Sequence, residues 1–373
     1  GQDTLLQPFS GQRLASIADI DRFLAGMRSD FSERELRSYW DSHRADRSAL
    51  FGRAVCSDPH APAYRDQIAR EYEQLSGRVL DSYENERTPS IDQGIHLARP
   101  FPYDMKHASV AASQMLYTFA RVFSLIDFAE GQRLVEFGSG WGNAVFQFAQ
   151  AGVAVTLVDI EENFLALARE RFTRLGMPLE CLHGEFNDVE LPADTYDYAF
   201  FMSAYHHCLD HAELLKKIHR GLKDGGRSIF CGEPIDEAVD VPWGLRMDGE
   251  SLWAIRHNGW LELGFRESYF RESLLAAGFQ VRKHVFTAEK GEVIWIAHKI
   301  RPGNFFFDHA AGTGVEQEDY YPPEASPAGR IVFSRKGETR LPLPRFPLDS
   351  AAQLSLIEHV DTDAVLRVGA DAN

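Results

Sequence analysis

The feature that most limits how this chain can fold is a regular alternation of strand and helix patterns between residues 105 and 299. Short apolar runs such as RLVEFG, VAVTLVD and YDYAFFM alternate with amphipathic stretches such as NFLALARERFTRLG and HAELLKKIHRGL. Strands separated by helices of about 10–15 residues form parallel βαβ units. The sequence therefore predicts an α/β domain with a doubly wound sheet over residues 105–299.

The two flanking regions have a different texture. Residues 1–104 are polar and carry apolar residues at three- and four-residue spacing, which predicts a helical extension or cap. Ser32 and Glu35 have the spacing of a capping box. Residues 300–373 are rich in proline and contain the extended-looking runs RIVFSRKG and RLPLPRF. This region is predicted to be a small β-rich appendage or a linker, with one helix over SAAQLSLIEHV.

Charge and cysteine usage exclude several classes of protein. The formal net charge is −16, from 55 acidic and 39 basic residues, which argues against nucleic acid as a partner because polyphosphate binding depends on Lys and Arg. The sequence has no run of 18 apolar residues and no secretory-signal pattern at its start. Its four cysteines stand far apart, without a C-x-x-C pair. We expect a cytoplasmic protein without a membrane span.

A glycine-rich turn, EFGSGWG over residues 136–142, follows the first strand pattern and opens a helix. Gly138, Gly140 and Gly142 let the backbone approach a ligand closely, and a helix N-terminus favours negative charge. The turn alone is weak evidence, because a dinucleotide site and a ligand-free tight turn have the same pattern.

Two acidic residues make the prediction more specific. Asp159 ends the next strand, about 20 residues after the glycines, where a carboxylate accepts hydrogen bonds from ribose hydroxyls. Glu136 precedes the first glycine, where it suits a cationic amino group and opposes a pyrophosphate. This contrast favours S-adenosylmethionine over a nicotinamide dinucleotide.

These residues belong to a longer resemblance. EFGSGWG resembles motif I of class I S-adenosylmethionine-dependent methyltransferases, which have a Rossmann-like fold. HGEFNDVELPADTYDYAFFMSAYHHCLD, HRGLKDGGRSIFCGEP and SYFRESLLAAGFQV resemble later segments of that family, in the same order over about 170 residues. Asp224 stands where the family usually has proline. The pattern is similar to the ubiquinone/menaquinone-type small-molecule branch, including members attached to glycan-biosynthesis proteins.

The resemblance implies a seven-stranded sheet whose last strand is antiparallel, with VRKHVF and EVIWIAHK as the closing hairpin. It also implies a set of residues that bind S-adenosyl-L-methionine. Glu136 and the turn Gly138, Ser139, Gly140 and Gly142 would hold the methionyl end, with Ser203 nearby. Asp159 would bind the ribose. Three residues would surround the adenine: Ile160, Glu185 and Phe186.

The catalytic candidates follow the fourth and fifth strands, at the edge where ligands gather. His206 and His207 titrate near neutrality, so either could accept a hydroxyl proton; His207 is the preferred base. The alternative is that both simply shape the acceptor site. Glu233 could bind acceptor hydroxyls or an amine, or be a solvated loop residue.

Other features have structural explanations of equal or greater weight. His207, Asp210 and His211 are spaced so that they could bind a metal, but a helix start explains Asp210 and His211 equally well, and we expect no metal. The tryptophans of the segment 242–267 could stack on a substrate, yet core packing is the better explanation for at least two of them. Tyr103, Lys106 and His107 could begin a lid over the cofactor or simply enter a helix.

We therefore expect a methyltransferase that uses S-adenosyl-L-methionine to methylate a hydroxyl of a small-molecule or glycan acceptor, with a histidine base. The alternatives are an N- or C-methyltransferase of a small molecule, and a non-catalytic cofactor-binding module of a larger glycan-assembly protein. A nicotinamide-dependent oxidoreductase remains a third class. The sequence SAYHH after the fourth strand disfavours enzymes that methylate nucleic-acid amino groups, which carry an N/D-P-P-Y/F run there.

Overall fold

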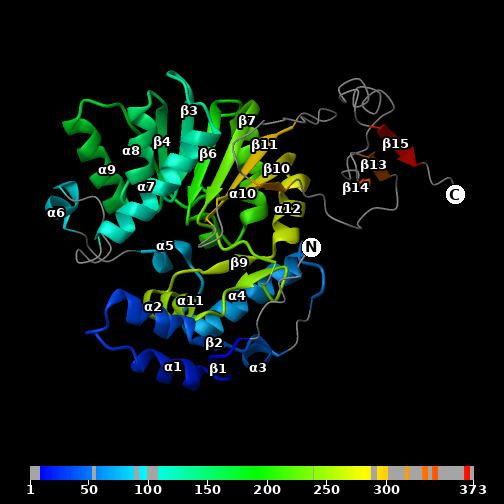
Figure 1. Ribbon diagram of the computed structural model, residues 1–373. Helices are drawn as coiled ribbons and strands as arrows, with labels where there is room; N and C mark the ends of the chain where they lie inside the picture. The colour runs from blue at the N-terminus through cyan, green and yellow to red at the C-terminus, as the bar shows by residue number, and fades with distance from the viewer. Residues whose placement is uncertain are drawn as a thin grey trace.

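The structure is a computed structural model of the 373-residue chain. It describes residues 9–52, 56–87, 92–98, 108–237, 239–286, 292–300 and four short C-terminal strands within 316–369. The described residues form a central sheet with helices on both faces, and a second body that lies along one edge of that sheet (Figure 1).

The central sheet has eight strands in the order β12-β10-β11-β7-β6-β3-β4-β5. The five parallel strands are β3 (Arg133–Phe137), β4 (Ala154–Asp159), β5 (Glu180–His183), β6 (Tyr196–Met202) and β7 (Leu222–Cys231). β11 (Glu292–Lys299) runs antiparallel to both β7 and β10 (Phe279–Phe286). The predicted seven-stranded sheet with its closing hairpin is confirmed, and the three-residue β12 (Glu316–Glu318) is an unexpected eighth strand on the β10 edge.

Helices cover the two faces of the sheet and bury its apolar side chains. One face packs against α7 (Ala108–Leu125), α8 (Asn143–Gln150) and α9 (Glu162–Arg174). The other packs against α10 (His211–Gly221) and α12 (Glu267–Ala276). Because parallel strands covered on both faces are buried throughout, β3, β4 and β6 are almost continuously apolar.

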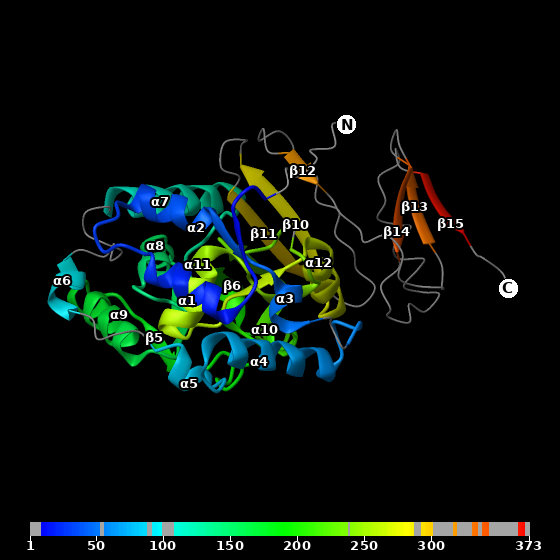
Figure 2. The same ribbon diagram turned by 90° about the horizontal axis from the view of Figure 1, so that it is seen from below.

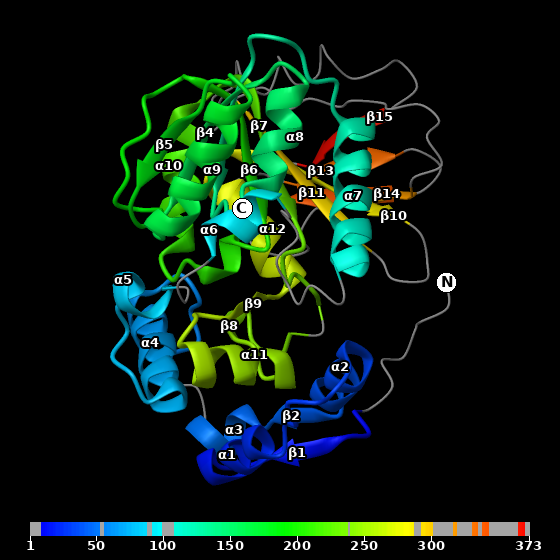
Figure 3. The ribbon, with the colours of Figure 1, turned by 90° about the vertical axis from the view of Figure 1, so that its left-hand side faces the viewer.

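The second body, which we call the cap, combines two distant segments, residues 9–87 and 239–265. Its elements are β1 (Gln12–Leu14), α1 (Ile17–Ala25), α2 (Glu33–Asp41), β2 (His43–Ala45), α3 (Arg47–Phe51), α4 (Pro62–Ser76), α5 (Ser82–Asn85), β8 (Trp243–Leu245), α11 (Gly249–Trp253), a π-helical turn (Ala254–Asn258) and β9 (Leu263–Phe265). The Tyr64 hydroxyl donates to the Trp243 carbonyl (2.9 Å), and the Ala45 amide to the Met247 carbonyl (2.7 Å). Figures 2 and 3 show both segments on the same side of the core.

The N-terminal helices arise from local signals that the sequence displays. The capping box of Ser32 and Glu35 is present at the start of α2. Within the predicted helical region, β2 separates α2 from α3 and pairs in parallel with β1. That pairing joins residues about 30 positions apart, which helical periodicity cannot reveal.

Near the carboxyl end, β13 (Arg330–Ser334), β14 (Glu338–Pro342) and β15 (Val365–Gly369) form a three-stranded antiparallel sheet. The helix predicted over residues 350–360 lies outside the described residues. Within the part of the chain that the structure describes, no helix combines the length and apolarity needed to cross a bilayer.

Candidate functional site

The glycine-rich turn leaves β3 and enters α8 with three residues in the left-handed region. The φ angles of Gly138, Gly140 and Gly142 are 70°, 46° and 68°. A Cβ atom on Gly140 would meet nothing within 4 Å, so this part of the turn faces open space. A Cβ on Gly138 would lie 2.6 Å from the Cβ of Ala204. Glycine at this position therefore lets the turn pack directly against the segment that follows β6.

Asp159 ties the end of β4 to the glycine turn. One carboxylate oxygen accepts from the Ser139 hydroxyl (3.1 Å) and the Gly140 amide (3.2 Å), and the other accepts from the Glu161 amide (2.8 Å). Burial raises the pKa of Asp159 to about 6, although these hydrogen bonds oppose the rise. The residue predicted to bind ribose thus also fixes the shape of the turn.

Glu136 is a buried acid at the base of the same turn. Its side chain is almost fully buried, and burial raises its pKa well above the ordinary value, with a further contribution from Asp159. Its Oε2 atom has no hydrogen-bond partner among the described residues. A buried acceptor without a partner is costly, so this atom is suited to a donor that arrives with a ligand.

The predicted adenine-side residues lie after β4 and β5. Phe186 lies beside the glycine turn, since a Cβ on Gly138 would be 3.3 Å from its ring. The Glu185 carboxylate accepts from the Asn187 amide (2.7 Å), and partial burial raises its pKa. Ile160 is half-buried next to Asp159. The structure thus brings the predicted cofactor-side residues to one edge of the sheet.

The segment after β6 begins with a strained residue. Ser203 has φ of 52°, a left-handed conformation that is uncommon for a residue other than glycine. Its hydroxyl donates to the Gly232 carbonyl (3.2 Å), which links the ends of β6 and β7. The 3-10 turn Tyr205–His207 follows at once, with Ala204 in contact with the glycine turn as described above.

The carboxylate of Glu233 holds this 3-10 turn in place through hydrogen bonds. Its carboxylate accepts from the backbone amides of Ala204 (2.9 Å), Tyr205 (3.0 Å) and His206 (3.2 Å). The same carboxylate lies 2.8 Å from Nδ1 of His206, and its side chain has no exposed surface. Glu233 is therefore not a solvated loop acid. Its oxygens are engaged by the protein itself, which gives it a positioning role.

His206 lies between two carboxylates. Nδ1 faces Glu233, and Nε2 is 3.5 Å from Oε2 of Glu262 in the cap. Burial lowers the pKa of His206, but the charge of Glu233 and its hydrogen bond to Nδ1, together with the charge of Glu262, outweigh burial and raise the pKa to about 9. Burial alone would raise the pKa of Glu262, but His206 brings it down to about 2. The two carboxylates thus favour the protonated form of this imidazole.

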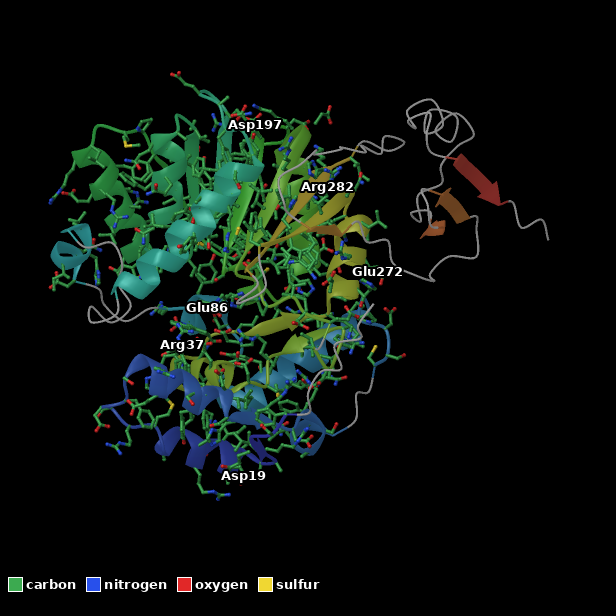
Figure 4. The ribbon with its side chains drawn as sticks, in the orientation of Figure 1. Asp19, Arg37, Glu86, Asp197, Glu272 and Arg282 are labelled. Carbon is green, nitrogen blue, oxygen red and sulfur yellow. The ribbon has the colours of Figure 1, made fainter. Side chains whose placement is uncertain are left out.

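His207 has a different environment and is more open, with 22% of its side chain exposed. Its Nδ1 atom is 3.1 Å from Oε2 of Glu86, yet it has no hydrogen-bond partner among the described residues. Glu86 is held by the Leu261 amide, which donates to its other oxygen (2.7 Å). Trp260 meets the His207 ring edge to face at 6.4 Å. Figure 4 shows Glu86 between the cap and the core sheet.

We refer to Glu86, His206, His207, Glu233 and Glu262 as the histidine–glutamate cluster. Sequence reasoning found three of its members and missed Glu86 and Glu262. Neither of these two stands in a motif, and both are supplied by the cap. In the sequence, Glu86 lies in the N-terminal flanking region and Glu262 in the segment 242–267. Neither position distinguishes these residues from the other acidic residues nearby.

Other predicted residues take structural roles. His211 packs away from His207 and hydrogen-bonds the Tyr269 hydroxyl (2.9 Å), while Asp210 pairs with Arg65. The His207–Asp210–His211 combination is therefore not a ligand set. Trp243 is buried with its Nε1 donating to the Pro59 carbonyl (2.9 Å).

The rest of the segment 242–267 also packs within the cap. Trp253 packs against Trp40 with tilted rings whose centroids are 5.4 Å apart, so packing explains two of the three tryptophans, as expected. Arg246 pairs with Asp248 and Glu262, and Arg256 with Asp21. Tyr103, Lys106 and His107 lie outside the described residues.

Comparison with known proteins covers the core of the chain. A family model described as a methyltransferase domain matches residues 135–230. Phosphoethanolamine N-methyltransferase 3 of Arabidopsis thaliana is 24% identical over 158 residues, which are 41% of this chain and 32% of that protein. The ubiquinone biosynthesis O-methyltransferase of Paramagnetospirillum magneticum is 28% identical over 172 residues, which are 44% of this chain and 66% of that protein. The chain thus spans about one third and just under two thirds of these curated relatives.

A solved structure is similar over the same core. It is phosphoethanolamine N-methyltransferase 2 of Haemonchus contortus in complex with S-adenosyl-L-methionine, with a TM-score of 0.41 and 16% identity over 50% of this chain and 53% of that chain. The family model matched over residues 135–230 and these curated relatives support an S-adenosylmethionine-dependent methyltransferase domain in the centre of the chain.

Proposed function

We propose that the protein transfers the methyl group of S-adenosyl-L-methionine to a hydroxyl of a small-molecule or glycan acceptor. The observation that carries the proposal is the contact between the two halves of the site: the glycine turn packs on Ala204, one residue before the turn that bears His206 and His207. A cofactor on the glycine turn would therefore lie next to the histidine–glutamate cluster.

The cofactor side fits S-adenosyl-L-methionine. The open space at Gly140 admits a ligand against the backbone, and the unpartnered Oε2 of Glu136 suits the ammonium group of the methionyl end. Asp159 retains lone pairs for ribose hydroxyls, because each of its oxygens can accept more bonds than the protein supplies. When bound, the cofactor supplies a methyl group activated by a sulfonium.

The chain's own task is alignment and proton removal. Methyl transfer is an in-line displacement, so holding acceptor, methyl and sulfur in line can supply several orders of magnitude in rate. A hydroxyl acceptor must also lose its proton. His207 is the better placed base, because Glu86 lies at its Nδ1 and its ring is partly exposed. His206 is held by two carboxylates and would position the acceptor side.

The first experiment separates binding from chemistry. Calorimetry with S-adenosyl-L-methionine and with its demethylated product is followed by a labelled-methyl assay against sugars, phenols and amines. We expect cofactor binding and label in a hydroxyl acceptor. Tight cofactor binding without label in any acceptor would favour a non-catalytic module. Stabilisation by a nicotinamide dinucleotide alone would favour an oxidoreductase.

His207→Ala tests the base. We expect turnover to fall by about 10²–10⁴-fold, the usual contribution of a positioned acid or base, while cofactor affinity is kept. The matched control is His257→Ala, which alters an exposed histidine of the cap. Normal turnover in His207→Ala would remove the base assignment and leave the cofactor assignment intact.

An amine acceptor is the second candidate. The cluster brings three carboxylates together, those of Glu86, Glu233 and Glu262, and such a group attracts a cation. Label found in an amine and absent from hydroxyls would favour N-methylation. In that case a histidine base would be needed only to remove a proton from the ammonium form of the acceptor amine.

A further inference from the structure

Three side chains of the cluster are arranged as ligands of one ion. One ligand atom each from His206, His207 and Glu262 lies within 4.8 Å of the others. The histidines come from the turn after β6, and Glu262 from the cap segment before β9. His206 and Glu262 are buried and His207 is half-buried. We propose that these three residues bind a divalent transition-metal ion, for which Zn²⁺ is the best match.

The separation of the two buried groups supports a metal. Nε2 of His206 and Oε2 of Glu262 are 3.5 Å apart. An N–H···O hydrogen bond is usually about 2.7–3.2 Å long. Two ligands on a tetrahedral zinc with bonds of about 2.0–2.2 Å are roughly 3.4 Å apart. The observed distance is long for a direct hydrogen bond and suits two atoms that share an ion.

The surroundings of the histidines supply the second argument. A metal-bound histidine almost always donates its other ring N–H to a carboxylate or carbonyl, which fixes the tautomer. Nδ1 of His206 is 2.8 Å from Glu233, whose carboxylate is itself fixed by three backbone amides. Nδ1 of His207 lies 3.1 Å from Glu86 but forms no hydrogen bond to it, so this argument rests on His206. With Nδ1 of His206 engaged, its Nε2 is left for an ion.

The ligand types of His206, His207 and Glu262 indicate which metal ion they would bind. Two imidazoles and one carboxylate are a ligand set of catalytic zinc sites, in which a fourth position is kept for water or substrate. Mg²⁺ and Ca²⁺ prefer oxygen ligands alone. The local charge also suits a cation, because Glu86 and Glu233 flank the set, and among the described residues their ion pairs and those of Glu262 include one Arg or Lys, Arg246, 3.4 Å from Glu262.

The role of the ion rests on the proposed function. An acceptor hydroxyl in the fourth position would lose its proton to water at a lower pH than in solution, as water does on zinc. In this arrangement the ion, and not a His207 base, would cause the acceptor hydroxyl to lose its proton. His207 would serve as a ligand of the ion. The competing arrangement is purely ionic, with a protonated His206 between Glu233 and Glu262.

The test measures metal binding without cofactor or acceptor. The full chain, free of any affinity tag, is treated with chelator and titrated with Zn²⁺, Co²⁺ and Mg²⁺ by calorimetry, with the Co²⁺ visible spectrum as a second readout. We expect one equivalent of Zn²⁺ to bind, Co²⁺ to give a tetrahedral or five-coordinate spectrum, and Mg²⁺ to bind at least 100-fold more weakly.

Variants locate the site. His206→Gln and Glu262→Gln should each weaken Zn²⁺ binding by at least 100-fold, whereas the surface control His257→Gln should leave it unchanged. Circular dichroism shows whether the glutamine variants fold. If one does not, Glu262→Asp, which keeps the charge, is measured in its place. Absence of a stoichiometric Zn²⁺ site, or a site that these variants leave intact, would overturn the proposal in favour of the ionic arrangement.

A labelled-methyl assay on the chelated protein keeps the two proposals distinct. Full transfer without metal would leave the methyltransferase proposal standing and remove the catalytic role of the ion. Stoichiometric Zn²⁺ binding without transfer to any acceptor would keep the metal site and contradict the proposed function.

Discussion

The two sides of the candidate site are built in different ways. The cofactor side consists of consecutive strand ends, with the glycine turn after β3, Asp159 at the end of β4 and Glu185 after β5. The acceptor side is assembled from distant parts of the chain, because Glu86 and Glu262 of the cap meet the histidines that follow β6. The backbone geometry of the glycine turn mainly shapes the cofactor side, whereas a buried network of charged side chains shapes the acceptor side.

This difference indicates where each side is vulnerable. The cofactor side should respond to single changes mainly in affinity, since its hydrogen bonds are separate and local. The acceptor side should respond in stability and turnover together, because removing one member of a buried ionic network leaves its partners uncompensated. The predictions below test this contrast.

The largest effect is expected for Glu233→Ala. The change removes the acceptor of three backbone amides and the partner of His206, so the free energy of unfolding should fall by about 3–5 kcal/mol, with loss of turnover. Urea unfolding and the labelled-methyl assay measure the two effects. Glu233→Gln is the control, since it keeps the size and one acceptor oxygen. A stability loss below about 1 kcal/mol would contradict the network description.

The next effect is a pair of opposite pH dependences. Burial lowers the folded-state pKa of His211, beneath the acceptor turn, from 6.5 to about 4. Between these values the unfolded state binds a proton that the folded state does not, so stability is lost as the pH falls. The loss reaches about 3 kcal/mol at pH 4.

On the cofactor side, Asp159 acts in the other direction. Its folded-state pKa of about 6 exceeds the ordinary 3.8, so the folded state binds the extra proton and stability is gained as the pH falls, by about 2 kcal/mol at pH 4. Unfolding of the parent, His211→Gln and Asp159→Asn between pH 7 and pH 4 resolves both contributions. Toward acid, the parent should lose stability relative to His211→Gln and gain it relative to Asp159→Asn. The same sign in both comparisons would refute the contrast.

Asp159→Ala should weaken S-adenosyl-L-methionine binding by about 1–3 kcal/mol, the usual effect of losing hydrogen bonds to a charged group. Calorimetry at pH 7.5, where the parent carboxylate is ionised, gives the dissociation constants. Asp159→Asn retains an acceptor oxygen and should lose less. An unchanged dissociation constant in Asp159→Ala would count against its role at the ribose.

The smallest effect is expected within the cap and away from both sides. Asp21 forms an exposed ion pair with Arg256, at 2.8 and 3.1 Å. Asp21→Asn should lower stability by less than about 1 kcal/mol, as is usual for surface pairs, and should leave cofactor affinity and turnover unchanged. A clear loss of turnover would mean that the docking of the cap controls the acceptor side.

Local patterns in the sequence were enough to predict the parallel strands and the glycine turn: apolar runs define buried strands, helices between them impose parallel pairing, and glycines allow the positive φ angles of the turn. Asp159 could be placed because it ends the strand after the glycine turn, and the ends of parallel strands meet at one edge of a sheet. The seven-stranded sheet, its closing hairpin and the role of Glu185 were predicted from the resemblance to class I methyltransferases.

The acceptor side depends on tertiary contacts that the sequence does not reveal. The sequence favoured His207 over His206 as the base without showing their surroundings, and packing of the cap sets Glu262 against His206 and Glu86 against His207. Glu86 and Glu262 lie more than 170 positions apart in the chain. Local patterns carry no information about such contacts, since they depend on how distant segments of the chain pack together. The two carboxylates beside His206 are brought together by that packing and not by the motif in which His206 stands.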